Sequence, residues 1–301
     1  ESEVKILLTD GNNGTIKTFK VIVNQVDSDN DSVSDHSDYY KNDNSKYRYN
    51  MDPRLTELGT SLVLWLDSSR EDSPDINSFV MEGDYIKQWN DLSSYANHAI
   101  SNQDQMPELI LNGYKGEKSV KFDGVNDYLL SPVTVYPPYH MFVVGRFWND
   151  DGPFLGSGDG SKYWRIGNNG KMGMYAHAHV AYEDPTNNDY FLVNVKGIPY
   201  NTSNYTAYIY LNGQDITDSP NSAKLYDGGH NVGLAYQPSL GDYGSAEYVE
   251  LILVNRELSP LEIGNVHSYL SEKWGFDNFV DSDGDSFLDY EEYGNAKGDG
   301  N

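Results

Sequence analysis

The chain contains no cysteine and few basic residues. Without cysteine it forms no disulfides and performs no thiol catalysis, so bound calcium can supply cross-links that the chain otherwise lacks. Its 21 Lys and Arg stand against 46 Asp and Glu, which gives a formal net charge of -25. This charge disfavours nucleic acid and anionic membrane surfaces as partners. The alternative interpretation is that the acidic side chains only keep the surface solvated.

Long apolar runs are also missing. No segment is apolar over the length needed to span a bilayer, and the N-terminal ESEVK lacks a charged and then apolar leader. We therefore expect no signal peptide, no membrane segment and no insertion into a membrane. Because the chain does not begin with Met, we expect it to be a piece of a longer protein.

Two acidic stretches, 27–38 and 281–292, place carboxylates at their first, third, fifth, ninth and twelfth positions. This is the ligand spacing of an EF-hand-type calcium loop, whose seventh residue contributes its carbonyl oxygen. We predict calcium in both loops. The predicted ligands are Asp27, Asp29, Asp31, Val33, Asp35 and Asp38 in the first loop, and Asp281, Asp283, Asp285, Phe287, Asp289 and Glu292 in the second.

Both loops depart from the usual pattern. Ser32 and Ser286 stand where a glycine normally makes the sharp turn, and Asp38 is shorter than the usual bidentate glutamate. The alternatives are an Asp- and Ser-rich linker at the first stretch and a flexible acidic tail at the second. Both stretches resemble thrombospondin type 3 repeats, a resemblance that implies calcium-rigidified spacers between domains.

Short strands dominate the rest of the chain. Residues 3–24 are predicted to form a hairpin. From Thr56 to Phe276, short apolar or alternating segments are separated by Gly, Asn, Asp and Pro, which predicts an all-β sandwich or barrel.

One helix is expected near the C-terminal end of this region. Ser259 can cap it, Pro260 suits its first position and Glu262 can complete a capping box. Gly275 can take the left-handed conformation that ends it. Between these two ends, four apolar residues recur on one face of the helix, and we expect this face to pack on a sheet: Ile263, Val266, Leu270 and Trp274.

Five segments occur in the order typical of bacterial LamG-like, concanavalin A-like jelly-roll domains. They are LVLWLDSS (62–69), IKQWNDLSSYANHAI (86–100), KSVKFDGVNDYLL (118–130), TAYIYLNGQ (206–214) and the strand, helix and WGF of 250–276. The resemblance implies a jelly-roll β-sandwich of two antiparallel sheets with one C-terminal surface helix. Lectins, adhesion modules and glycan hydrolases share this fold, so the fold does not select a function.

The resemblances divide the chain into four parts. Residues 9–26 resemble the last two strands of the immunoglobulin- or cadherin-like repeats of large bacterial surface proteins. We therefore expect a C-terminal hairpin of an upstream repeat at 1–26, an acidic calcium-loop linker at 27–55, a LamG-like sandwich at 56–277 and an EF-hand-like loop at 278–301.

A third calcium is one of two interpretations of the sequence KFDGVNDY, where Asp123, Asn126 and Asp127 follow a predicted strand. Some related sandwiches hold calcium, and these side chains offer oxygen ligands. The other interpretation is turn chemistry, in which Asp and Asn bond nearby main-chain groups and Gly124 supplies a positive φ.

A sugar-binding surface is suggested in the middle of the chain. His177 and His179 are two apart on a predicted strand and so share a face, as zinc ligands or a sugar-facing pair would. No third ligand for zinc is identifiable. Aromatic faces can stack on sugar C–H groups, although tyrosine is also an ordinary strand residue. The candidate glycan-binding residues are Tyr163, Trp164, Tyr175, His177, His179 and Tyr182.

Catalytic signatures are missing. Glycosidases need two carboxyl groups roughly 5 to 10 Å apart, and the ExDxE-type strand of glucanases that resemble this fold is absent. Glu247 and Glu250 lie three apart on a predicted strand and are expected to point to opposite faces. Neither GxSxG nor HExxH occurs in a suitable context. We therefore expect that the chain is not an enzyme.

Together these patterns predict a non-catalytic, calcium-stabilised module of a large secreted or cell-surface bacterial adhesin. Its partners would be a glycan or another cell-surface ligand and the neighbouring domains of the same chain, with no nucleic acid. The alternatives are a structural spacer or protein-binding module and, third, a glycan-degrading hydrolase.

Removal of calcium with a chelator should lower the melting temperature or loosen the chain ends, while the sandwich persists because its core is large enough alone. Calorimetry and small-angle scattering with and without chelator measure both effects. Identical melting and scattering profiles would contradict calcium binding at the two loops.

Overall fold

The computed structural model describes residues 2–9, 14–21, 52–69, 79–82, 84–148, 152–159, 162–168, 171–175, 189–199, 204–217, 222–224, 230–238 and 240–276. The chain divides into two compact units, Glu1–Met51 and Asp52–Asn301, which we treat separately. The two predicted calcium loops lie outside the described residues. In the part of the chain that is described, no helix is long and apolar enough to cross a membrane.

The described part of the first unit is an antiparallel hairpin. Strands β1 (Ser2–Thr9) and β2 (Gly14–Val21) pair from Ser2 opposite Val21 to Thr9 opposite Gly14. The hairpin predicted from the sequence is therefore confirmed.

The second unit is an all-β sandwich, as predicted, with every strand pairing antiparallel. Its first layer is built on β21 (Ser245–Val254) and β10 (Tyr139–Phe147), which pair with each other. The strand β10 continues to β14 (Phe191–Pro199) and β15 (Asn204–Leu211), and β15 pairs with β16 (Gln214–Asp215) and β17 (Ser222–Lys224). The other edge of β21 pairs with β8 (Ser119–Asp123) along its first half and with β3 (Leu62–Asp67) along its second.

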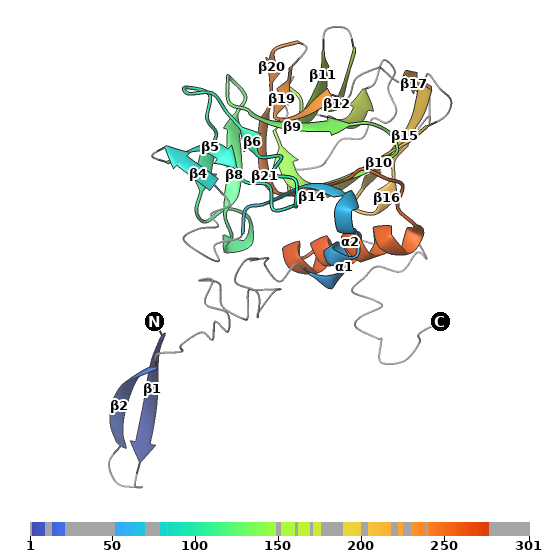
Figure 1. Cartoon of the computed structure of the whole chain (residues 1–301). Coiled ribbons are helices and arrows are strands. Elements are labelled where there is room, and N and C mark those ends of the chain that lie inside the picture. The colour runs from blue at the N-terminus through green and yellow to red at the C-terminus, as the bar shows by residue number, and fades with distance from the viewer. Residues whose placement is uncertain are drawn as a thin grey trace. The chain divides into compact units, whose positions relative to one another are not determined.

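The second layer faces the first across the core (Figure 1). In pairing order it contains β4 (Phe79–Glu82), β5 (Tyr85–Trp89), β6 (Ala99–Ile100), β9 (Leu129–Val135), β18 (His230–Leu234), β11 (Leu155–Asp159), β12 (Lys162–Asn168) and β13 (Lys171–Tyr175). Strand β7 (Glu108–Ile110) pairs with both β5 and β8 and so joins the layers at one side. A short hairpin of β19 (Tyr236–Gln237) and β20 (Asp242–Tyr243) follows β18.

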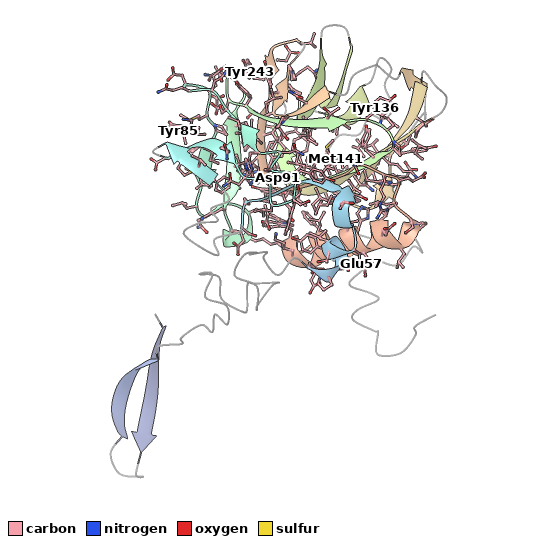
Figure 2. All side chains as sticks on the ribbon, viewed as in Figure 1. Glu57, Tyr85, Asp91, Tyr136, Met141 and Tyr243 are labelled. Carbon is pink, nitrogen blue, oxygen red and sulfur yellow. The ribbon has the colours of Figure 1, made fainter. Side chains whose placement is uncertain are left out.

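The core between the layers follows the two-residue period of the strands. On β9, alternate residues from Leu129 to Val135 are buried, as expected for a strand with one face toward water. On β10 nearly every residue is buried, because the sheet has the core on one side and a helix on the other. Met141 of β10 lies in the middle of this core (Figure 2).

A β-bulge in β21 changes which residues share a face. Val144 of β10 lies opposite Glu250, but the next residue, Gly145, lies opposite Tyr248, so Val249 is an extra residue. A Cβ at Gly145 would lie 2.5 Å from the Glu247 carbonyl oxygen, so only glycine fits here. The bulge turns both Glu247 and Glu250 to the outer face of the layer, whereas Tyr248 and Leu251 belong to the core.

The predicted helix is confirmed as α2 (Pro260–Trp274). Ser259 and Glu262 form the capping box, and Gly275 ends the helix with φ 67°. The short helix α1 (Pro53–Thr56), followed by the 3-10 turn η1 (Gly59–Ser61), lies beside it (Figure 1), and Arg54 binds Glu272 of α2.

Helix α2 is held to the sheet by the buried carboxylate of Glu250. Its Oε1 accepts hydrogen bonds from Trp65 Nε1 and Tyr269 OH, both 2.8 Å away. Its Oε2 accepts from Lys273 Nζ at 2.8 Å and Trp274 Nε1 at 2.6 Å. Lys273 also binds Asp67, and both carboxylates are fully buried. Burial raises the pKa of Glu250, an effect that Lys273 opposes.

Replacing Lys273 by methionine should lower the free energy of unfolding by about 3 to 5 kcal/mol, because two buried carboxylates then lose their cation. Urea unfolding near neutral pH measures this change. The matched control is Lys121→Met, whose exposed ion pair should contribute less than about 1 kcal/mol. Equal effects of the two substitutions would contradict the role of Lys273.

Two buried histidines lie between α2 and the sheet. His140 of β10 stacks on Phe142, and His267 of α2 meets the edge of the same ring. Within the described residues, Nε2 of His267 has no hydrogen-bond partner. Burial lowers the pKa of each histidine to about 4, and the charge of Lys196 adds to this at His140.

These histidines should make the fold less stable in acid. They stay neutral in the folded chain, whereas the unfolded chain binds protons below its ordinary histidine pKa of about 6.5. Stability should therefore fall as the pH drops from about 6.5 towards about 4, by on the order of 3 kcal/mol per histidine.

The measurement is urea unfolding at several pH values for the natural chain and for a His140→Gln, His267→Gln double variant. Carboxylates titrate in the same range, with Glu250 acting in the opposite direction. The difference between the two chains isolates the histidines. Equal pH dependence in both would refute the prediction.

Candidate functional site

A cavity of about 530 Å³ opens on the outer face of the first layer, beside the C-terminal end of α2. Five segments build it: the end of β7 with the 3-10 turn η2 (Tyr114–Gly116), then β8, the end of β10, the residues before β14, and β21. The lining residues are Ile110, Asn112, Gly113, Tyr114, Lys115, Lys121, Arg146, Trp148, Asp189, Tyr190 and Glu247.

The carboxylate of Glu247 forms part of the cavity wall, with its residue only 2% exposed. The hydroxyl of Ser119 donates a short hydrogen bond to its Oε1. Gly113 leaves room for this contact, since a Cβ there would lie 2.0 Å from Ser119 Oγ. Burial alone would raise the pKa of Glu247, but Ser119, Tyr190 and Arg146 lower it. Glu247 is therefore a fixed negative charge.

Arg146 lies beside this carboxylate and between two aromatic rings. Its Nε and Nη2 donate to Glu247 Oε2 at 3.0 and 2.7 Å. Its guanidinium carbon is 5.0 Å from the ring centroids of both Trp148 and Tyr190. Cation–π contacts and the ion pair together hold the guanidinium in one orientation.

Tyr114 links the cavity to the end of α2. Its ring stacks on Tyr190 with centroids 4.0 Å apart, and on Phe276 at 5.9 Å. The next residue, Lys115, donates from Nζ to the Gly275 carbonyl at 3.0 Å. Burial and the charge of Asp189 raise the pKa of Tyr114 to about 12, so its phenol stays protonated at neutral pH.

A second cavity of about 460 Å³ shares Lys121 with the first. Most of its charged lining residues are acidic. Tyr85 of β5, which is labelled in Figure 2, also lines it and is 52% exposed. It is lined by Tyr85, Gln103, Asp104, Met106, Glu108, Lys121, Asp123, Asn126 and Asp127.

The residues predicted as a third calcium site line this second cavity and make turn hydrogen bonds. Asp123 Oδ1 accepts from the main-chain N–H of Val125, Asn126 and Asp127. Asn126 donates its side-chain amide to the Asp104 carbonyl at 2.7 Å. Burial and the charge of Asp123 raise the pKa of Asp127 to about 6. In the ranges that the structure covers, no three His, Asp or Glu side chains are grouped to hold a metal ion.

The predicted glycan-binding residues belong to another part of the sandwich. Tyr163 and Trp164 lie on β12, opposite Gly158 and Ser157 of β11, and Tyr175 ends β13. His177, His179 and Tyr182 lie outside the described residues. The lining of the first cavity includes none of the six.

Sequence reasoning missed most of this cavity. Its residues come from positions 110–121, 146–148, 189–190 and 247, and no motif joins them. The segment RFW at 146–148 contained the strongest available signal, an arginine two residues from a tryptophan on one strand face.

The expectation that Glu247 and Glu250 point to opposite faces was wrong. It assumed a regular two-residue period, and the bulge at Val249 breaks that period. Glu250 is covered by α2, whereas Glu247 faces the cavity, where Asp189 is the second carboxylate.

No family model and no curated protein matches the chain. Among solved structures, Trypanosoma rangeli sialidase is similar with a TM-score of 0.49 and 16% identity, over 71% of this chain and 33% of the sialidase. The binding domain of botulinum neurotoxin serotype D gives a TM-score of 0.46 and 12% identity, over 72% of this chain and 52% of that domain. The chain thus spans about a third of the sialidase and about half of the toxin domain.

This comparison contradicts the expectation that the chain is not an enzyme, because the similar structures include sialidases, which are enzymes. That expectation also assumed that Glu247 and Glu250 point to opposite faces of the strand, whereas the two side chains share a face. We therefore withdraw the expectation.

Proposed function

We propose that the sandwich binds a saccharide in the cavity around Trp148, Arg146 and Tyr190. One observation carries the proposal: a cavity of about 530 Å³ places three aromatic side chains beside a fixed arginine–glutamate pair. Small-molecule sites typically occupy about 300 to 1,000 Å³ and combine aromatic walls with a few precisely placed polar groups.

The two kinds of wall match the two kinds of surface on a sugar ring. The C–H face of the ring packs on an aromatic side chain, while its hydroxyls need donors and acceptors. Trp148 and Tyr190 offer rings, and Asn112, Lys121 and Asp189 offer polar groups on the same cavity.

The cavity is also organised before any ligand arrives. Glu247 holds Arg146 through two hydrogen bonds, and Ser119 holds Glu247. Tyr114 stacks on Tyr190 and packs near Phe276. Side chains that are already ordered cost less entropy on binding, which favours a specific ligand.

The setting of this module in a larger protein is a further part of the proposal. The ordered LamG-like segments support a LamG-like domain of a secreted or cell-surface adhesin, joined to neighbouring domains. The ligand spacing at 27–38 and 281–292 supports calcium in the segments before and after the sandwich. Calcium there would stiffen the connections through which the sandwich is presented.

The test is a glycan array followed by calorimetric titration of each saccharide that binds. Trp148→Ala should weaken binding at least about tenfold, or about 1.4 kcal/mol, because a buried aromatic contact is lost. The bound saccharides are then analysed for cleavage products.

The matched control is Tyr136→Ala, which removes a 48% exposed tyrosine, labelled in Figure 2, that lines neither cavity. Its affinity should equal that of the natural chain. If no saccharide binds, or if both substitutions weaken binding equally, the cavity is not the saccharide site.

A further inference from the structure

We propose that the saccharide held in the first cavity is anionic, carrying a carboxylate or sulfate group that Arg146, Lys115 and Lys121 receive. This inference rests on the proposed function, because it names the chemical class of the ligand of the same cavity. Two further features support it: the local charge and the unused donors.

Positive charge is concentrated in this cavity. Lysine and arginine account for 21 of the 301 residues of the chain but for 3 of the 11 that line the cavity. With Glu247 and Asp189 as the acidic members, the lining has a formal charge of 3 − 2 = +1, against -25 for the whole chain. A local positive site on an acidic protein favours a specific anionic group while the rest of the surface repels polyanions.

Arg146 has donor capacity beyond its ion pair. Its Nε and Nη2 both donate to Oε2 of Glu247. Its Nη1 donates to no residue in the described part of the chain. The side chain remains 33% exposed. A guanidinium held between two rings presents its remaining N–H groups in a fixed direction, which suits a planar carboxylate or a sulfate oxygen.

The two lysines also keep donors available. Lys115 gives one hydrogen bond to the Gly275 carbonyl, and an ammonium group has three N–H donors. Lys121 Nζ lies 4.0 Å from Glu108 Oε2, and both side chains are about half exposed, so this ion pair is weak. Glu247 is nearly fully buried and paired with Arg146, so these two charges offset each other, and the net positive charge of the lining comes from the two lysines against Asp189.

The neighbouring cavity has the opposite charge. Asp104, Glu108, Asp123 and Asp127 line it against the single cation Lys121. An anionic group is therefore repelled from that side, and Lys121 stands at the boundary between the two. The charged group of the saccharide should lie toward Arg146 and Lys115.

The experiment measures affinities for matched oligosaccharide pairs: uronic acid oligosaccharides beside their carboxyl-reduced forms, and sulfated oligosaccharides beside their desulfated forms. For at least one pair, the charged form should bind at least about tenfold more tightly than its neutral partner. The type of pair that shows the preference identifies carboxylate or sulfate as the recognised group.

A Lys115→Met, Lys121→Met double variant should reduce that ratio to about twofold or less, because the charged form loses more affinity than the neutral form. The control with the same net charge is Lys87→Met, Lys196→Met, which removes two lysines that line neither cavity. Thermal melting of both variants checks that they are folded, and Arg146 is left intact because it pairs with buried Glu247.

Three results would overturn the inference. If neutral and charged forms bind equally, or if the control variant reduces the ratio as much as the cavity variant, the anionic preference is wrong while saccharide binding stands. If no member of any pair binds, the inference fails, and the proposed function fails with it only if the glycan array also shows no binding.

Discussion

The position of two glutamates on strand β21 is the constraint on which the second unit depends. Glu247 and Glu250 belong to a central strand whose other face forms the hydrophobic core. In a regular strand, residues three apart point to opposite faces, so one carboxylate would enter the core without partners. The extra residue Val249 prevents this and turns both to the outer face.

Each glutamate then organises a different part of that face. Glu250 receives hydrogen bonds from two tryptophans, a tyrosine and Lys273, and so attaches α2 to the sheet. Glu247 receives hydrogen bonds from Ser119 and Arg146, and so shapes the wall of the cavity. A carboxylate can be buried only when such donors surround it, which explains why both sites are rich in them. The helix covers one part of the face, and the cavity lies beside its end.

The aromatic residues connect these two parts. The ring of Tyr114 stacks on that of Tyr190 in the cavity, and its centroid lies 6.3 Å from the ring centroid of Trp274 at the end of the helix. A change in the packing of α2 would therefore reach the cavity through the ring of Tyr114 and through the Lys115–Gly275 hydrogen bond. The lining has a net charge opposite in sign to that of the chain, so in the proposed function charge and shape would select the ligand together.

The sequence by itself determined the features that depend on neighbours along the chain. Alternating strands predicted the all-β sandwich, and the capping box at Ser259 with Gly275 predicted both ends of α2, because these signals are local. The calcium-loop spacing is local in the same way, and its ligands remain predictions. Only the tertiary structure decided the cavity. Residues between 110 and 247 reach it through strand pairing, and the bulge leaves no mark in a strand that is buried on both faces. Which distant residues meet depends on register, and register is a property of the paired strands together.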